Sequence, residues 1–319
     1  MIYSIVIPVY KNEESITSLL QQLEKLEGRI RKEFNCKLEV VFIVDGSPDK
    51  SFILIEEQID KLPFSFQLAS LSRNFGAFSA VRAGLAIAKG DFIATKAADL
   101  QEPIELYVDF LSAMQNENYD VVIATRTSRD DPWSSKIFAK IFWEFYRKVI
   151  QNEVPSGGAD VFGCKNEVRH NLLKLKEINT SLLGLLFWVG YKRKLIPYHR
   201  LARENGKSTW SLKKKINYVM DSFFSFSALP IRFMYFAGGI GIIFSIVFSA
   251  LAIWDKINHN VAVPGYTATI LVISFFGGLN LLASGIIGSY VWRSFENTKG
   301  RPDFIILKHL ESKPHQINN

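Results

Sequence analysis

Residues 92–103 have the sequence FIATKAADLQEP, a short apolar run followed directly by polar residues. The apolar part, Phe92–Thr95, has the length and composition of a buried β-strand. Four further runs have the same character, and they are Ser4–Ile7, Leu38–Val44, Phe66–Leu71 and Val121–Thr125. Helix-like segments separate them, with apolar residues at spacings of three and four from Ile16 to Leu26, and with Ala80–Lys89 ending at Gly90. This alternation predicts an α/β fold with a parallel sheet and crossover helices.

Polar residues follow each of the first four predicted strands. These four clusters are residues 8–14, 45–49, 72–76 and 98–103. In open parallel sheets ligands bind beyond the carboxyl ends of the strands, where these clusters would lie. Any one of them alone is ordinary turn chemistry, but four in succession indicate a ligand site. The glycine patterns of dinucleotide-binding and P-loop proteins are absent from the sequence.

The fourth cluster contains a candidate metal site. Asp99 and Gln101 point to the same side if the end of the strand is extended. Their two oxygens would suit one hard divalent cation, Mg²⁺ or Mn²⁺, and would leave other coordination positions for diphosphate oxygens and water.

The composition excludes an intrinsically disordered chain. Of the 319 residues 48% are hydrophobic, and the length suits about two domains. Cys36 and Cys164 are the only cysteines, so neither a disulfide framework nor a zinc cluster is expected. The N-terminus has no basic region before its short apolar run, which predicts a strand in a cytosolic domain.

Two stretches without a charged residue, Phe233–Trp254 and Val261–Trp292, are long enough to span a bilayer as helices. Lysine and arginine concentrate outside the segment that joins them, so both termini should face the cytosol. We therefore expect a multi-pass protein of the inner (cytoplasmic) membrane. The expected parts are a domain at 1–210, a juxtamembrane amphipathic region at 211–230, transmembrane helices at about 233–254 and 267–292 within 231–292, and a cytosolic tail at 293–319. Paired glycines in both spans permit close helix contacts, which leaves a homo-oligomer open.

Basic residues concentrate just before the first apolar stretch. The whole chain has a net charge of +7, whereas residues 192–215 contain nine Lys or Arg and one Glu. This block continues into the aromatic and aliphatic segment Ile216–Phe224, which is typical of a helix at a membrane surface. Its position favours membrane lipid or a lipid phosphate as the partner and argues against nucleic acid.

In their order along the chain, these motifs resemble family 2 glycosyltransferases of the membrane-bound polyprenyl-phosphate type, such as dolichol-phosphate mannose synthases and bactoprenol glucosyltransferases. The matching motifs are Pro8-Val9-Tyr10, Asp45-Gly46-Ser47, Ser72–Gly76, Asp99–Pro103, Arg203 with Gly206-Lys207-Ser208, and Arg301-Pro302. The resemblance implies a GT-A (Rossmann-like) nucleotide-sugar domain. It also implies a nucleotide-sugar donor, usually a UDP-sugar or GDP-mannose, a divalent metal, and inverting transfer to a lipid phosphate.

The resemblance assigns a role to each matching position. It implies nucleotide contacts at Pro8, Tyr10, Glu13, Asp45 and Arg73. It places the metal and diphosphate at Asp99 and Gln101, and it makes Asp160 a second catalytic candidate that orients the acceptor or acts as a base. Two departures stand out, because Val44 and Ala97 occupy positions where the family commonly has Asp. They imply weaker metal affinity or a different donor, and they keep open a catalytically silent membrane scaffold.

The acceptor side needs positive charge more than a base, because a phosphate monoester is already largely dianionic at pH 7. Arginine can hold phosphate through two parallel hydrogen bonds, and lysine as a point charge. The candidates are Arg126, Arg129, Arg203 and Lys207. The leading hypothesis is sugar transfer to polyprenyl phosphate, and the alternatives are another membrane acceptor or the silent scaffold. The sequence does not identify the sugar.

Overall fold

The computed structural model describes residues 1–58, 61–128, 144, 147, 155, 159–177, 180–201, 220–258 and 265–312. It divides into two compact units. The first comprises residues 1–218 and 301–319, and the second comprises residues 219–300. We describe each unit by itself.

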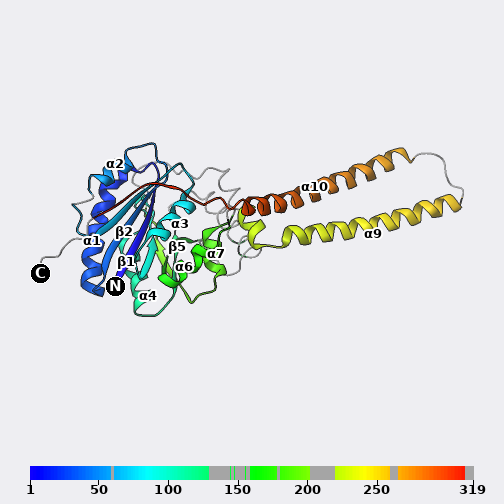
Figure 1. Ribbon diagram of the computed structural model, residues 1–319. Coiled ribbons are helices and arrows are strands. Elements are labelled where there is room, and N and C mark those ends of the chain that lie inside the picture. The colour runs from blue at the N-terminus through cyan, green and yellow to red at the C-terminus, as the bar shows by residue number, and fades with distance from the viewer. Residues whose placement is uncertain are drawn as a thin grey trace. The chain divides into compact units, whose positions relative to one another are not determined.

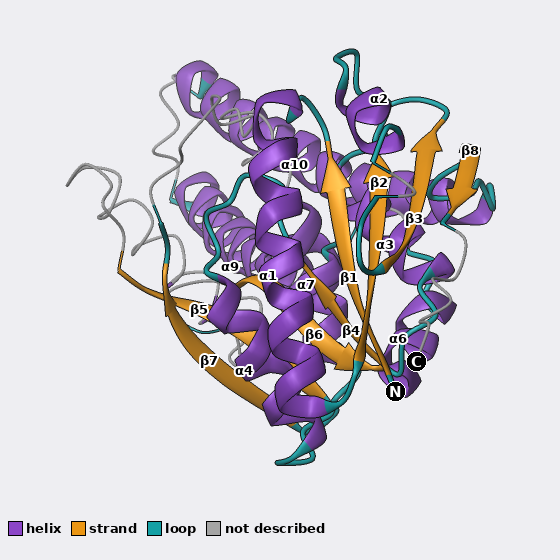
Figure 2. Ribbon diagram, turned by 90° about the vertical axis from the view of Figure 1, so that its left-hand side faces the viewer, coloured by secondary structure: helices purple, strands orange, loops and turns teal. Residues whose placement is uncertain are grey.

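The first unit is built on an eight-stranded sheet with the strand order β7-β5-β6-β4-β1-β2-β3-β8 (Figure 2). The strands are β1 (Ile2–Val9), β2 (Lys37–Val44), β3 (Ser65–Leu71), β4 (Phe92–Thr95), β5 (Val121–Ser128), β6 (Ala159–Lys165), β7 (Arg193–His199) and β8 (Ile306–Glu311). β1 pairs in parallel with β2 and β4, β2 with β3, and β5 with β7. The parallel sheet expected from the first five apolar runs is therefore confirmed, while β6 and β8 run antiparallel to their neighbours.

Helices cover both faces of this sheet (Figure 2). They are α1 (Ile16–Phe34), α2 (Ser51–Glu56), α3 (Ala77–Ile87), α4 (Ile104–Gln115), α6 (Asn166–Lys174) and α7 (Leu182–Trp188), with a short 3-10 helix η1 (Glu13–Ser15) before α1. α1 packs against α4 over one face, and α3 packs against α6 over the other. Side chains alternate between the two faces of the sheet along β1. Tyr3, Ile5 and Ile7 belong to the apolar cluster that also contains the apolar residues of α1, whereas Val6 faces Gly84 of α3.

The contact between α3 and the sheet is close at Gly84. A Cβ atom at this position would lie 2.2 Å from Cγ1 of Val6 and 3.3 Å from Cγ1 of Ile43. Both valine and isoleucine are fully buried in the sheet, so they have little room to move. Only a residue without a side chain lets α3 approach β1 this closely.

We expect Gly84→Ala to lower the free energy of unfolding by about 1–3 kcal/mol, because the added methyl overpacks the α3–β1 contact. Gly28→Ala is the matched control, since a Cβ there meets nothing within 4 Å on the exposed face of α1. Alanine in an exposed helix position should leave stability unchanged or raise it slightly. Thermal unfolding of the full chain in detergent, followed by circular dichroism, compares the two. Equal melting temperatures for both variants would contradict the packing argument.

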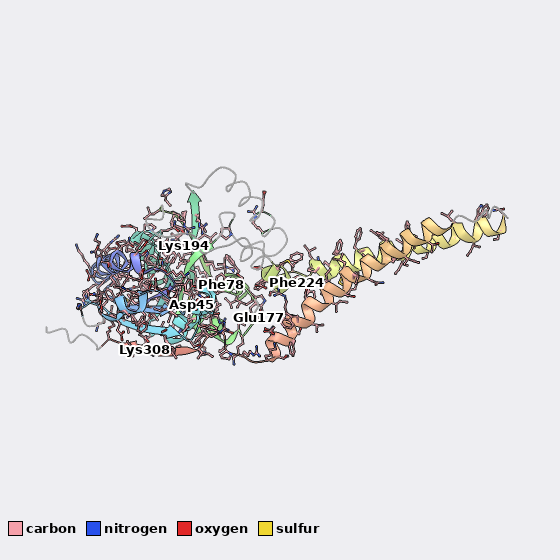
Figure 3. All side chains as sticks on the ribbon, turned by 90° about the horizontal axis from the view of Figure 1, so that it is seen from above. Asp45, Phe78, Glu177, Lys194, Phe224 and Lys308 are labelled. Carbon is pink, nitrogen blue, oxygen red and sulfur yellow. The ribbon has the colours of Figure 1, made fainter. Side chains whose placement is uncertain are left out.

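The chain beyond the second long helix returns to the sheet, which the expectation of a simple tail at 293–319 did not include. β8 pairs antiparallel with β3, and Lys308 of β8 is labelled in Figure 3. Arg82 of α3 forms an ion pair with Asp303 at 2.7 Å, and the backbone N–H of Phe66 donates to Oγ of Ser312 at 2.8 Å. The sheet domain is thus completed by residues that follow the apolar helices in sequence.

The second unit contains the long helices α9 (Leu229–Ile257) and α10 (Tyr266–Thr298), which run beside each other (Figure 1). Each contains a window long and apolar enough to cross a membrane, Leu229–Phe248 and Phe275–Thr298, by length and composition. Only 6% and 0% of these windows are buried, whereas a core helix of a soluble protein would be mostly buried. Exposed apolar side chains on both helices are typical of lipid-facing segments.

A short helix at 220–226 precedes α9 and packs against the end of α10. Asp221 forms an ion pair with Arg293 at 2.8 Å, and the rings of Phe224 and Tyr290 lie 5.3 Å apart. The guanidinium of Arg293 also lies 5.2 Å from the ring of Phe224. This helix falls in the expected juxtamembrane region at 211–230, of which residues 211–219 lie outside the described part of the chain.

Candidate functional site

The sheet topology brings the predicted site residues to one edge. β1 to β5 and β7 run in the same direction, so their carboxyl ends share this edge. β6 runs the other way and therefore begins there, with Ala159 opposite Thr125 of β5. The described residues at or just beyond this edge are Pro8, Tyr10, Glu13, Asp45, Arg73, Asp99, Gln101 and Arg126. Asp160 is placed there through the backbone of β6, while Arg129, Arg203 and Lys207 lie outside the described residues.

Asp45 follows β2 and connects two of the polar clusters. Its Oδ1 accepts a hydrogen bond from the N–H of Phe75 at 2.7 Å, and its Oδ2 accepts one from Gly76 at 2.8 Å. Asp45 is 2% exposed, and Figure 3 labels it together with Phe78, the second residue of α3. The carboxylate therefore fixes the loop that leads into α3, a role that sequence reasoning did not predict.

Gly46 allows this connection. Its φ is +57°, and a Cβ there would lie 2.4 Å from the carbonyl carbon of Arg73. A side chain at this position would separate the two loops that the Asp45 carboxylate joins. Glycine after Asp45 is thus required both by the backbone conformation and by the space.

Glu13 belongs to a second hydrogen-bonded cluster between the loops after β1 and β2. One oxygen of its carboxylate accepts from the N–H of Lys50 at 3.0 Å, and its own N–H donates to Asp49 at 3.1 Å. The Asp49 carboxylate also accepts from the hydroxyls of Ser47 and Ser51 at 2.6 and 2.8 Å. Burial alone would raise the pKa of Asp49, but these hydrogen bonds outweigh it and lower the pKa. The cluster holds the residues after β1 in a fixed position.

Three predicted nucleotide-binding residues lie around these clusters. Pro8 is the next-to-last residue of β1, and Tyr10 follows that strand with its N–H donating to Oδ1 of Asn12 at 3.0 Å. The exposed Arg73 places its guanidinium 4.0 Å from the centre of the Phe75 ring. A half-buried tyrosine ring and an exposed guanidinium are suitable contacts for a base and for phosphate.

The loop after β4 presents Asp99 and Gln101, but through a different backbone from the one expected. β4 ends at Thr95, so the assumption of an extended strand through Gln101 is wrong. Leu100 between them has a φ of +61°, in the left-handed region that non-glycine residues rarely adopt. Oδ1 of Asp99 accepts from the N–H of Gln101 at 3.4 Å, so the turn keeps the two residues together.

Arg200 is a site residue that sequence reasoning did not single out. It directly follows β7, and a terminal nitrogen of its guanidinium donates to Oε1 of Gln101 at 2.5 Å. The same nitrogen lies 3.9 Å from Oδ2 of Asp99. Two hydrogen bonds between Gln101 and the backbone of Leu201 connect the same two loops. Both proposed metal ligands therefore face one guanidinium.

A buried ion pair lies beneath this loop. Lys96 is 1% exposed and Glu102 is 2% exposed, and Nζ of Lys96 lies 3.9 Å from Oε2 of Glu102. Nζ also donates to the backbone carbonyl of Glu102 at 3.2 Å and lies 4.9 Å from the ring of Tyr107. Burial raises the pKa of Glu102 to about 7, with Lys96 acting in the opposite direction. Burial likewise lowers the pKa of Lys96.

The protein ligands at this site suffice for a divalent cation only when the nucleotide-sugar is bound as well. Among the described residues, no three His, Cys, Asp or Glu side chains form a group that could hold a metal. Asp99 and Gln101 supply one carboxylate and one amide oxygen, which are ligands that Mg²⁺ and Mn²⁺ accept. Such a small set is sufficient where diphosphate oxygens and water complete the coordination shell, as in other nucleotide-dependent sites.

Arg126, a predicted acceptor-phosphate residue, lies near the end of β5 and is half-buried. It pairs in register with Tyr198 of β7, two residues before Arg200. The positive charges of Arg126 and Arg200 thus come from neighbouring strands at the same edge. A diphosphate or a phosphate monoester at this edge would meet charges of the opposite sign.

The sequence of this chain is similar to those of several known proteins. Residues 4–174 match the family model described as glycosyl transferase family 2. A Synechocystis protein named "Uncharacterized glycosyltransferase sll0501" is 32% identical over 95% of this chain and 94% of its own length. The Escherichia coli K12 "Prophage bactoprenol glucosyl transferase homolog" is 31% identical over 96% of this chain and 98% of its own. Among solved structures, Staphylococcus aureus TarS 1–349 in complex with UDP-GlcNAc matches 65% of this chain and 60% of its own, with 17% identity and a TM-score of 0.44.

Proposed function

Because the chain belongs to glycosyl transferase family 2, we propose that this enzyme transfers a sugar from a UDP-sugar to a polyprenyl phosphate, with inversion at the anomeric carbon. One observation supports this acceptor above all. Over 96% of its length the chain is 31% identical to a protein named for bactoprenol, which is a polyprenol. The UDP form of the donor follows from the resemblance in the sequence motifs, as does the requirement for Mg²⁺ or Mn²⁺.

In the proposed reaction an oxygen of the lipid phosphate attacks the anomeric carbon while the bond from that carbon to the diphosphate breaks. The electron pair of that bond leaves with the nucleoside diphosphate. A divalent cation, when bound, supplies positive charge that stabilises the departing diphosphate. Asp99 and Gln101 would hold that cation, and Tyr10 and Arg73 would contact the nucleotide.

The acceptor is aligned by charge and needs no strong base, because its phosphate is largely ionised at neutral pH. Arg126 would bind the phosphate from β5, and Arg129, Arg203 and Lys207 would extend this positive surface. Asp160 at the start of β6 would orient the acceptor on the opposite side of the sugar from the leaving group. Fixing the two reactants in one orientation is itself a large part of the rate enhancement of such a transfer.

The proposed location is the cytosolic face of the inner membrane, with α9 and α10 crossing the bilayer and both termini in the cytosol. The lengths and apolar compositions of these helices and the basic block at 192–215 support it. A lipid phosphate stays at the membrane surface, so the chain needs both a nucleotide-sugar domain and membrane helices to meet it.

A donor screen tests this function. The purified full-length chain is incubated with Mn²⁺, undecaprenyl phosphate and one nucleotide-sugar labelled in its sugar, which is UDP-glucose, UDP-N-acetylglucosamine or GDP-mannose. The lipid products are then separated and identified by mass spectrometry. We expect one labelled glycolipid with undecaprenyl phosphate and none with undecaprenol, which has no phosphate. Labelling of other lipids in a membrane extract, without labelling of undecaprenyl phosphate, would instead identify a different acceptor. UDP binding by calorimetry without any turnover would indicate the silent scaffold.

A further inference from the structure

Among the described residues, two cations interact electrostatically with the Asp99 carboxylate, and they differ in burial and in their contacts. Lys96 is fully enclosed and is held by the carbonyl and the carboxylate of Glu102. Arg200 is 26% exposed in its side chain, and its Nε is buried with no hydrogen-bond acceptor among the described residues. Of these two cations, the guanidinium is therefore the one that can move. Moving it would break its hydrogen bond to Gln101 and its ion pair with Asp99.

We propose that Arg200 is a stand-in cation, which occupies the position of the divalent metal until the metal arrives together with the donor diphosphate. This inference rests on the proposed function and deepens it, because it concerns the order in which the cation and the donor bind. Arg200 contacts Gln101 at 2.5 Å and approaches Asp99 to 3.9 Å, the two residues proposed to hold the metal. A guanidinium and a divalent cation would compete for these oxygens, so binding of one weakens binding of the other.

The formal charges around the site explain the order. Among the described residues, Lys96 and Arg200 carry two formal positive charges, and Asp99 and Glu102 carry two formal negative charges. A metal ion alone would add two positive charges next to the guanidinium. A metal ion with a diphosphate adds nearly none, and the diphosphate also offers the displaced guanidinium a new partner. Metal binding should thus depend strongly on nucleotide.

The inference is tested by Mn²⁺ titration of the full-length chain in detergent, with and without UDP. The electron paramagnetic resonance signal of free Mn²⁺ disappears on binding, so it gives affinity without any measurement of turnover. Arg200→Gln should bind Mn²⁺ about tenfold more tightly than wild type without UDP, because one repelling charge is removed. Because Arg200 has already left the metal position when UDP is bound, the Mn²⁺ affinity with UDP should stay close to that of wild type, so the enhancement by UDP should be about tenfold smaller in this variant. By linkage, the enhancement of UDP affinity by Mn²⁺ should fall by the same factor.

Two further variants make the result specific. Lys194→Gln also removes one positive charge, but near the start of β7, where Lys194 pairs with Glu117. Lys194 is labelled in Figure 3. The Lys194→Gln variant should bind Mn²⁺ as wild type does. Arg200→Lys should be intermediate, since lysine keeps the positive charge but lacks the guanidinium group that contacts Gln101 and Asp99. If Arg200→Gln does not fold, this variant decides the question by its Mn²⁺ affinity without UDP.

The outcomes separate this inference from the proposed function. If wild type binds Mn²⁺ with UDP, but neither Arg200 variant gains affinity without UDP, the stand-in role is wrong and the metal site survives. If no variant binds Mn²⁺ even with UDP, the metal-dependent function itself fails, and the stand-in role fails with it. If Arg200→Gln gains no Mn²⁺ affinity without UDP and loses Mn²⁺ binding in the presence of UDP, Arg200 supports the metal complex and does not compete with it.

Discussion

Asp99→Ala is expected to lower kcat by about 100-fold or more at saturating donor, if the proposed transfer is the reaction. Asp99 is the one charged residue of the proposed metal pair, and its carboxylate would carry the direct interaction with the cation. The leaving diphosphate would then depart without a fixed positive charge beside it. Sugar transfer to undecaprenyl phosphate, measured at several Mn²⁺ concentrations, gives the effect on kcat and on the metal requirement.

A control separates this effect from a general loss of acidic charge or of stability. Asp109 lies on the exposed side of α4, so Asp109→Ala should keep wild-type activity. Asp99→Asn keeps the shape of the side chain and removes its charge, and it should fall close to Asp99→Ala. Asp99→Ala with more than a tenth of wild-type activity would contradict the assignment of this carboxylate to the metal.

The central strands were predictable because they are buried on both faces. β1, β2 and β4 are mainly apolar on both faces, which is the pattern of strands in a covered parallel sheet. The edge strands have no such pattern. β7 contains Arg193, Lys194 and Pro197, and every residue of β8 is exposed or half-buried. Edge strands keep charges and proline to prevent further pairing, and these features weaken the sequence signal.

The site was predictable where its members are neighbours in sequence. Asp99 and Gln101 are two residues apart, so their association needed only a turn, although Leu100 makes that turn in an unexpected way. Arg200 lies 99 residues after Gln101, directly beyond the end of β7, and β7 was not predicted. The available signal was a basic residue directly after a strand. Using it required the order of the strands in the sheet, which shows that this strand ends at the same edge.

The hydrogen bonds of Asp45 show a different limit. Asp45-Gly46-Ser47 was predicted as a ligand motif, yet the structure uses both carboxylate oxygens to hold the loop before α3. Such loop-to-loop hydrogen bonds depend on how two strand ends meet in space, and no periodicity reports them. A nucleotide contact by Asp45 stays a prediction. The structure explains Asp45 and Gly46 without a ligand, because they connect the loop after β2 to the loop before α3.

Lys96→Met is expected to lower the free energy of unfolding by about 3–5 kcal/mol at pH 8, the largest stability change that we predict. The lysine is 1% exposed, and its loss removes the cation that is paired with the buried Glu102 carboxylate. The double variant Lys96→Met/Glu102→Gln removes both charges and should recover most of the loss, because a buried pair can be replaced by uncharged residues at little cost. Thermal and urea unfolding of the three proteins measures this. A double variant less stable than Lys96→Met would contradict the pairing.

The pH dependence of the Lys96→Met effect has a definite sign. Burial already raises the pKa of Glu102 from 4.5 to about 7, and removing Lys96, which lowers that pKa, must raise it further. Above pH 4.5 the unfolded chain then releases a proton that folded Glu102 keeps, so stability falls as pH rises towards the folded pKa. At pH 5 Glu102 is neutral in the folded variant, and the difference from wild type should be small. Because Glu102 of the folded wild type also keeps its proton up to its pKa of about 7, the difference should grow mainly above pH 7. A loss that instead shrank between pH 7 and pH 8 would place the damage elsewhere than at the carboxylate.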